Sequence, residues 1–592
     1  MTTLLAPTGR RKLTGKPPLP PALSLRYEQG ERLARPIWFG PEGRPAFGWF
    51  HSPAGDKCRG GVVICPPLGQ EHIDAHYGLR LLAEQLAVAG ICALRFDYDG
   101  TGDSAGDNDD PARVSSWLAT VEHAVAAVRA AGAANVCLVG LRLGATLAAT
   151  AAATTGDIDQ VVLWDPCSGR QFLREQKALR AMQFGAPPGM PEGSVELLGV
   201  RFGPATARAV NALDLAGCSL PVARRALVLT RPDRPGNPSF TAGFGRELTE
   251  RGEAEGQAKF MDRYPPFQRL PRGTISRVTQ WLCEGAPPQR TLLKRPPVAG
   301  PHVVGYTPSG HGVVETPVSI PPLGLFGIVT HLDTPQRPKG PTVLLLNVAN
   351  QHHIGPTRLW VELARQWAGA GLVSLRVDLS GLGDSPARPG DDRWIFAKPA
   401  AFDDVEEVAR CVSPDDPSNI VLVGLCSAGY QALEGALALR SRGVVAVNTA
   451  VSFVPAERRA RQPLDPRRRV ALPQDQVAEA FREGGRLGGL RQRFPNLAWR
   501  ARILGSPKTR SGRWLTDLVR NGTDTFLICG DDEWRPVRSG VTALQLRRLR
   551  RTGRLRLEHI AGLQHDLFVT EHRRLVARLV TGYVVSKFAN PA

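Results

Sequence analysis

The sequence contains an internal repeat, which constrains the fold more than any single motif in the chain. Residues Leu94–Ser104 read LRFDYDGTGDS, and residues Leu375–Ser385 read LRVDLSGLGDS. A second match follows each copy in the same order, with VCLVGLRLGAT at Val136–Thr146 and IVLVGLCSAGY at Ile420–Tyr430. Two collinear matches at nearly equal separations indicate a duplicated domain. A chain of 592 residues is also long enough for at least two domains.

Each copy alternates short apolar strands with helices. The first strands are GVVIC at Gly61–Cys65 and VLLLN at Val343–Asn347, and each is followed by an amphipathic helix. Next comes a strand that ends in Arg-x-Asp, and a Gly-rich loop follows it. A second helix and a strand that enters a tight Gly turn complete each copy. This order predicts an α/β fold with two tandem domains, each a mostly parallel sheet flanked by helices. The expected boundaries are a disordered Pro-rich leader at 1–24, domains at 25–283 and 302–592, a Pro/Gly-rich linker at 284–301, and an Arg-rich cap insertion around 454–521.

Composition limits the class of protein and its partners. No apolar run approaches the ~20 residues needed to cross a bilayer, and the N-terminus lacks the apolar core of a secretory signal. Ten sparse cysteines indicate a reducing compartment, the cytoplasm, and no Cys/His cluster suggests a metal. The net charge of +19 is compatible with an acidic partner, but no nucleic-acid motif accompanies it. We expect no membrane span, no metal or other cofactor and no nucleic-acid partner.

The turn in the second repeat match is typical of a nucleophile elbow, Gly-x-nucleophile-x-Gly, at a sharp strand-to-helix turn. In the second copy, Cys426 occupies the nucleophile position, with small residues Gly424 and Ala428 two positions before and after it. Ser427 is the rival, but the residue two positions before it is the bulky Leu425. We therefore predict Cys426 as the nucleophile. The alternative is a buried structural cysteine.

The catalytic acid should follow a later strand. The segment TFLICG at Thr525–Gly530 is typical of a buried strand, and it runs into three consecutive carboxylates. In folds with a nucleophile elbow, the catalytic acid often lies three residues after a glycine that ends a strand. Counting from Gly530, this position is Glu533. Asp532 is the alternative.

The catalytic histidine should follow the acid with room for a helix and a strand between them. The segment LRLEHIAGLQHDLF places His565 just after an expected strand. His559 falls within that strand and His572 within the terminal helix, so both are expected to have structural or solvated roles. His565 would take the thiol proton, or hold the thiol as an ion pair, while the acid fixes the imidazole tautomer.

Backbone amides complete the predicted site. The N–H of Ser427 and an N–H near Val348 or Ala349 would bind the oxyanion. His352 and His353 lie in the same loop. Either they position substrate, or they pack the loop against the helix that follows it.

The first copy lacks both reactive groups. Arg142 occupies its nucleophile position, and a guanidinium stays protonated and cannot attack a carbonyl. No histidine lies between His123 and His302, and the region where one is expected reads FMDRYPPFQ at Phe260–Gln268. The first domain is therefore predicted to be catalytically inactive. An anion-binding role for Arg142 is the alternative.

The first copy resembles serine-aminopeptidase-type hydrolases, including those associated with the exosortase A system. The resemblance lies in CPPLGQE (Cys65–Glu71), RFDYDGTGDSAG (Arg95–Gly106), the elbow (Gly140–Ala145) and VLWDPCSGRQFLRE (Val162–Glu175). The resemblance implies an α/β-hydrolase fold, and an arginine at the elbow is familiar in that group.

The second copy is similar to bacterial α/β hydrolases with a Gly-Leu-Cys-Ser elbow, here Gly424–Ser427, and with a loop that carries Asn347, His352, Gly355, Pro356 and Arg358. A Cys-His-acid triad in this fold is also similar to that of dienelactone hydrolases. The second copy departs from the expected Gly-Ala order after the Cys-Ser pair, because its sequence there is Ala428-Gly429. These resemblances imply the fold and leave the substrate open.

Two functions remain from the sequence. In the first, the second domain forms an acyl-cysteine and passes the acyl group to water or to another acceptor, while the first domain packs against it as a scaffold. The substrate would be an acyl ester or thioester, and the Arg-rich cap would suit one on coenzyme A or an acidic carrier protein. In the alternative, both domains are pseudo-hydrolases that form a binding or assembly module.

Overall fold

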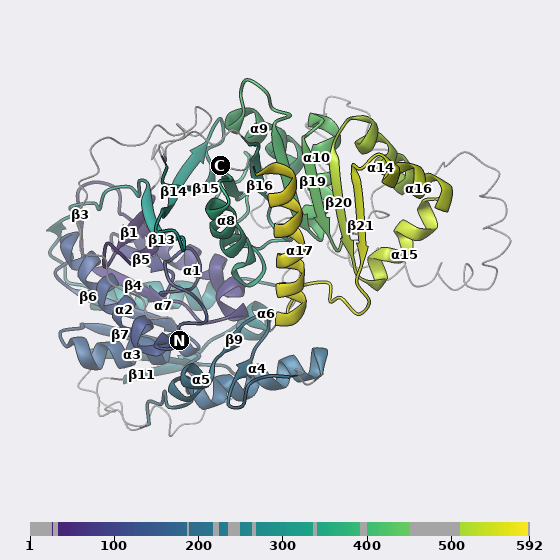
Figure 1. The fold of residues 1–592 in the computed structure, drawn as a ribbon. Coiled ribbons are helices and arrows are strands. Elements are labelled where there is room, and N and C mark those ends of the chain that lie inside the picture. The colour runs from purple at the N-terminus through teal and green to yellow at the C-terminus, as the bar shows by residue number, and fades with distance from the viewer. Residues whose placement is uncertain are drawn as a thin grey trace.

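The computed structural model describes residue 27 and residues 33–185, 189–216, 224–234, 249–262, 268–334, 340–390, 400–449 and 510–589. The expected leader and residues 454–509 of the expected cap insertion lie outside this part of the chain. In Figure 1 the first half, in purple and blue, lies beside the second half, in green and yellow.

Within the described residues, the first half contains a sheet of order β1-β2-β5-β4-β6-β7-β10-β11. Strands β1 and β2 pair antiparallel, as do β2 and β5, and all later neighbours pair parallel. The strands are β1 (Ala34–Phe39), β2 (Ala46–His51), β4 (Gly61–Cys65), β5 (Cys92–Phe96), β6 (Val136–Leu141), β7 (Gln160–Trp164), β10 (Arg225–Thr230) and β11 (Thr249–Glu253).

Helices cover both faces of this sheet. One face packs against α2 and α3, and the other against α1, α6 and α7, so that two separate apolar clusters form. The helices are α1 (Gln70–Val88), α2 (Arg113–Ala130), α3 (Leu143–Thr155), α4 (Gly169–Phe184), α5 (Pro204–Asn211), α6 (Gln257–Met261) and α7 (Arg272–Gly285). Two short strand pairs lie outside the sheet: β3 (Lys57–Cys58) with β12 (Thr291–Leu292), and β8 (Val195–Glu196) with β9 (Arg201–Phe202).

The second half repeats this architecture, with an added edge strand. Its order is β13-β14-β15-β17-β16-β18-β19-β20-β21, and pairing is parallel from β17 onward. Without β13, the order in space matches that of the first sheet strand for strand. The strands are β13 (His302–Tyr306), β14 (Gly312–Ile320), β15 (Leu325–Leu332), β16 (Thr342–Leu345), β17 (Ser374–Val377), β18 (Ile420–Leu425), β19 (Gly443–Val447), β20 (Asp524–Cys529) and β21 (Leu555–His559).

Helices also flank this second sheet (Figure 1). They are a 3₁₀ turn, η4 (Pro356–Arg358), and helices α8 (Leu359–Gly369), α9 (Ala400–Val412), α10 (Ser427–Leu439), α14 (Arg510–Arg520), α15 (Asp531–Gly540), α16 (Ala543–Arg551) and α17 (Thr570–Phe588). Strands β18 and β19 are buried along their whole length, as expected for apolar strands covered on both faces. The predicted fold class, two mostly parallel sheets flanked by helices, is therefore confirmed.

The two halves pack through equivalent surfaces. Arg95 of the first half binds Asp384 of the second at 2.7 Å, and Arg376 of the second half binds Asp103 of the first. These four residues occupy matching places in the two repeat segments. Phe47 of β2 stacks on Phe326 of β15, with ring centroids 6.5 Å apart. Such reciprocal contacts define an approximate two-fold relation, the geometry of an isologous dimer within one chain.

The chain between the halves is tied to the first half. In the expected linker, 284–301, strand β12 pairs with β3 and Leu293 joins the apolar core of the first half. The backbone N–H of Ala299 donates to the carbonyl of Pro36 at 2.8 Å. Across the described residues, no helix combines the length and apolarity that a bilayer span requires.

Candidate active site

The elbow of the second half forms where β18 meets α10. Cys426 lies between them with φ 56° and ψ −118°, a left-handed conformation that is strained for a residue with a Cβ. A Cβ on Gly424 would lie 2.3 Å from the backbone of Ala428, so glycine is required there. Ala428 itself is fully buried, so the Ala-Gly order after the Cys-Ser pair is accommodated. The side chain of Cys426 is half-buried at the carboxyl end of the sheet.

The structure brings the three predicted reactive groups together. His565 lies in the loop between β21 and α17, and its Nε2 is 3.0 Å from the Sγ of Cys426. Its Nδ1 is 2.7 Å from Oε1 of Glu533, in the first turn of α15. All three residues follow strands of the parallel sheet, whose carboxyl ends meet at one edge. The imidazole thus bridges a thiol and a carboxylate within hydrogen-bond distance of both.

The electrostatics of this group favour a protonated imidazole. Burial lowers the pKa of His565, but its hydrogen bonds to Cys426 and Glu533 outweigh burial and raise the pKa to about 11. For Glu533, burial raises the pKa, but the hydrogen bond from His565 reverses this and leaves it below its usual value. The arrangement is therefore compatible with a thiolate–imidazolium pair that is oriented by a carboxylate.

The rival residues lie elsewhere. Asp532 points to solvent, with its side chain 88% exposed. His559 binds Asp531 at 2.8 Å, and His572 accepts a hydrogen bond from the N–H of Gln564. These contacts agree with structural or solvated roles for both histidines.

The hydroxyl of Ser427 contacts the loop that follows β16. It is the first residue of α10, where backbone N–H groups have no partner within the helix. Its hydroxyl accepts a hydrogen bond from the N–H of Ala349 at 2.9 Å, which ties the elbow to the loop after β16. Ala349 has φ 50°, and its neighbour Val348 is buried. The two predicted sources of oxyanion donors therefore lie beside one another. Because the N–H of Ala349 is bound to the Ser427 hydroxyl, Val348 is left as the predicted donor from this loop.

Asn448 is a residue that the sequence analysis missed. It follows β19 with φ 45°, and its side-chain amide donates to the backbone carbonyls of Gln564 and His565 at 2.9 and 3.0 Å. Its Oδ1 accepts from the N–H of Gly530 at 2.9 Å. Asn448 thus connects Gly530, just before the acidic residues of α15, to the loop that carries His565. The sequence signal was a third repeat match, because VVLWD at Val161–Asp165 corresponds to VVAVN at Val444–Asn448. Asp165 likewise follows its strand, β7, with a positive φ of 48°.

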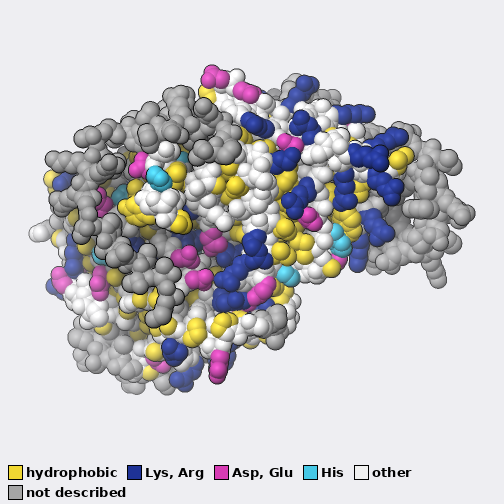
Figure 2. Space-filling model, viewed as in Figure 1, with side chains coloured by type: hydrophobic (Ala, Val, Ile, Leu, Met, Phe, Trp, Pro, Cys, Tyr) yellow, Lys and Arg dark blue, Asp and Glu magenta, His cyan; other side chains and the backbone are white. Residues whose placement is uncertain are grey.

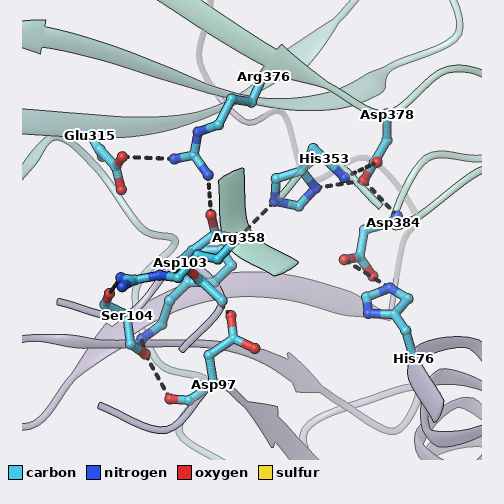
Figure 3. A network of polar contacts seen from close by, with 12 residues as sticks. His76, Asp97, Asp103, Ser104, Glu315, His353, Arg358, Arg376, Asp378 and Asp384 are labelled. Atoms are coloured by element: carbon cyan, nitrogen blue, oxygen red, sulfur yellow. Dashed lines mark hydrogen bonds and ion pairs between the residues drawn. The ribbon is translucent and has the colours of Figure 1, made fainter. Parts of the chain in front are cut away.

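His352 and His353 lie in the interface between the halves. The Nδ1 of His353 is 2.8 Å from Asp378 and its Nε2 is 2.7 Å from Asp103 of the first half (Figure 3). The His352 ring stacks on His76 of the first half, with centroids 4.1 Å apart. Both rings are buried. This placement favours the loop-packing alternative over substrate positioning.

We predict that raising the pH destabilises the wild type more than a His353→Gln variant. Burial lowers the pKa of His353, but the carboxylates of Asp378 and Asp103 raise it from 6.5 to about 10. Folding therefore stabilises a proton that the unfolded chain releases near pH 6.5, so this contribution is complete below that pH and is lost as the pH rises towards 10. Urea midpoints measured for both proteins from pH 6 to 10 should converge. Parallel curves would contradict the assignment.

The elbow of the first half has nearly the same backbone conformation as that of the second half but carries a different side chain. Arg142 has φ 55° and ψ −125° between β6 and α3, close to the values at Cys426. Its guanidinium binds Glu175 at 2.5 Å, Glu71 at 3.3 Å and Asp165 at 3.5 Å. Three carboxylates therefore already surround the charge, which leaves the anion-binding alternative without support. Residues 263–267, part of the segment where a histidine is expected, lie outside the described chain.

No group of histidine, cysteine or carboxylate side chains in the described residues has an arrangement that could hold a metal ion.

Comparisons with known proteins find similarity to parts of the chain. Residues 353–579 match the model of the alpha/beta hydrolase family. Nothing among the curated proteins matches the chain. Among solved structures, Est1E from Butyrivibrio proteoclasticus is 12% identical, with a TM-score of 0.33 over 42% of this chain and 98% of that one. A thioesterase domain from the curacin biosynthetic pathway is 15% identical, with a TM-score of 0.26 over 45% and 99%. Dienelactone hydrolase from Anabaena variabilis is 13% identical, with a TM-score of 0.28 over 47% and 99%.

Proposed function

We propose that the second half is an acyl-transfer enzyme, an esterase or thioesterase-type hydrolase or an acyltransferase, with Cys426 as nucleophile, His565 as base and Glu533 as acid. The observation that carries the proposal is the line of contacts from Sγ through the imidazole to the carboxylate, 3.0 Å and 2.7 Å long. The accessible, strained position of Cys426 at the elbow supports it, because strain there holds the sulfur above the sheet.

The chemistry would run in two steps. The thiolate of Cys426 attacks the carbonyl carbon of an ester or thioester, and the backbone N–H groups of Ser427 and Val348 stabilise the oxyanion. The tetrahedral intermediate collapses to an acyl-cysteine as the leaving alkoxide or thiolate takes the proton from His565. Water, or another acceptor activated by His565, then attacks the acyl-cysteine and regenerates the thiol.

The first half is proposed to be catalytically inactive. Its elbow carries Arg142, whose permanently charged guanidinium already has three acidic side chains as partners. Its role in this proposal is that of a folded partner for the second half.

An anionic acyl donor suits the basic surface beside the last strand of the second sheet. Helix α16 carries Arg547, Arg548, Arg550 and Arg551, all exposed, at the end of the sheet that holds β21. Figure 2 shows basic side chains gathered over this end of the molecule. A thioester on coenzyme A or on an acidic carrier protein would be attracted by such a surface. A cytoplasmic location remains a prediction.

An acyl-enzyme should form on Cys426 when the full chain is mixed with a p-nitrophenyl ester or an acyl-coenzyme A. Mass spectrometry after rapid acid quenching should find one acyl group on the peptide that contains Cys426, and none in a Cys426→Ala variant. The matched control is Cys411→Ala, because Cys411 is another half-buried, unpaired cysteine and lies outside the site. A wild type that is neither acylated nor active on either donor class would refute the enzyme and favour the binding-module alternative.

A further inference from the structure

The loop after β16, which carries the proposed oxyanion donor Val348, is bound to the first half. Arg358, at the far end of this loop, is buried and donates to three backbone carbonyls of the first half's Gly-rich repeat segment. The acceptors are Gly102 at 2.8 Å, Ser104 at 2.7 Å and Gly106 at 3.1 Å. A single guanidinium thus fixes the loop against three points of the opposite half, and Figure 3 shows Arg358 beside one of them, Ser104.

Other contacts extend this attachment along the same loop. The imidazole of His353 bridges Asp378 of its own half and Asp103 of the first half. Next to it, Ile354 packs in an apolar cluster with Ile73 of α1. The loop from residue 347 to residue 358 therefore has polar and apolar partners in the first half.

The loop that carries His565 is bound by a different part of the first half. The N–H of Gly199, in the turn between β8 and β9, donates to the carbonyl of Phe568 at 2.6 Å. Oε1 of Glu196, on β8, accepts from the N–H of Thr570 at 3.0 Å. The ring of Phe184, at the end of α4, contacts that of Phe568, with centroids 6.5 Å apart. These contacts begin three residues after the proposed base.

Both loops contain strained backbone. Ala349, Thr357 and Arg358 in the first loop, and Leu567 in the second, have positive φ although none is a glycine. Such conformations persist only where surrounding contacts determine them, and the contacts on these two loops come in large part from the first half. Free of that surface, the loops would relax towards ordinary backbone conformations.

We propose that the first half is a built-in positioning subunit: its Gly-rich repeat segment holds the oxyanion loop, 347–358, and its β8–β9 turn holds the histidine loop, 563–570. The inference rests on the function proposed above, and it assigns the inactive half a defined part in the reaction. The first half supplies no reacting atom. It places Ala349 beside Ser427, and His565 beside Cys426.

Two substitutions test the attachment of each loop to the first half separately. Arg358→Lys keeps the charge but leaves one ammonium where three hydrogen bonds were made. Thr570→Pro removes the N–H that donates to Glu196, and with it the buried threonine side chain. Proline is tolerated at the first position of a helix, and Val569 before it already has an extended conformation. The matched control is Arg95→Lys, which weakens the Arg95–Asp384 pair in the same interface without a hydrogen bond to either loop.

The expected pattern differs for each variant. Arg358→Lys should lower kcat on a p-nitrophenyl ester at least tenfold, with KM changed less than about twofold, and leave the rate of Cys426 alkylation by iodoacetamide unchanged. Thr570→Pro should lower both kcat and the alkylation rate, because the imidazole moves from the sulfur. Arg95→Lys should change neither. Equal losses of kcat in all three variants, or in none, would overturn the inference.

Hydrogen exchange provides a readout that is independent of turnover. Backbone amides of residues 347–358 should exchange faster in Arg358→Lys, and those of residues 563–570 faster in Thr570→Pro, while both loops stay protected in Arg95→Lys. Unchanged exchange in the two loop variants overturns the inference whether or not the chain acts on an ester. A wild type without acylation or turnover overturns only the proposed function.

Discussion

Replacing His565 with asparagine is expected to lower kcat for ester or thioester turnover by about 10²–10⁴-fold, the usual contribution of a positioned acid–base group. Asparagine cannot take the thiol proton or return it to a leaving group. It would still fill much of the same space between Cys426 and Glu533, so the fold should survive. Steady-state kinetics with a p-nitrophenyl ester and with an acyl-coenzyme A measure the loss. His559→Asn is the control, because this histidine of β21 binds Asp531 instead of the thiol.

The pH dependence of Cys426 alkylation distinguishes a chemical role for His565 from a structural one. The pKa of His565, raised to about 11, keeps the imidazole protonated in the folded protein. If Sγ and this imidazole form the proposed ion pair across their 3.0 Å contact, alkylation of the wild type by iodoacetamide should vary little from pH 6 to 9. In His565→Asn the rate should fall at pH 6 and rise steeply above about pH 8, as it does for free cysteines. The same profile in both proteins would exclude the ion pair.

Much of the fold and of the candidate site could be predicted because the determining signals are local. Apolar runs such as GVVIC, now β4, specify strands buried on both faces. The elbow could be located because Gly424 is enforced by contact with Ala428, four residues away. Cys426, Glu533 and His565 all follow parallel strands, so the strand order alone places them at one edge of the sheet.

The residues that could not be predicted depend on partners distant in sequence. Asn448 bonds to the backbone of the His565 loop, and backbone acceptors leave no trace in a sequence pattern. His353 was considered for substrate positioning because it lies in the oxyanion loop. Its second partner, Asp103, belongs to the other half. The repeat identified two copies of Asp103 and its segment, but it could not show that each copy faces the other across an interface.

The interface between the halves should lose about 3–5 kcal/mol of stability when Arg376 is replaced by methionine. Arg376 is fully buried and binds both Asp103 of the first half and Glu315 of β14, which lies at 2.7 Å. Removing one member of a buried charge group leaves the others without full compensation, which is more costly than the loss of the contact itself. Urea unfolding of the full chain, followed by tryptophan fluorescence, measures the change. A loss below about 1 kcal/mol would contradict the buried-pair assignment.

A second substitution tests whether uncompensated charge is the cause. In the Arg376→Met background, Glu315→Gln removes one of the two carboxylates, so the double variant should recover part of the lost stability. Arg365, which also binds Glu315 at 2.8 Å, would then keep the remaining amide hydrogen-bonded. Arg95→Met, the equivalent change in the first half, should destabilise the interface in the same way through Asp384. If the halves pack as an isologous pair, the two arginine variants lower stability by comparable amounts, whereas a loss confined to one would show that the reciprocal contacts are not energetically equivalent.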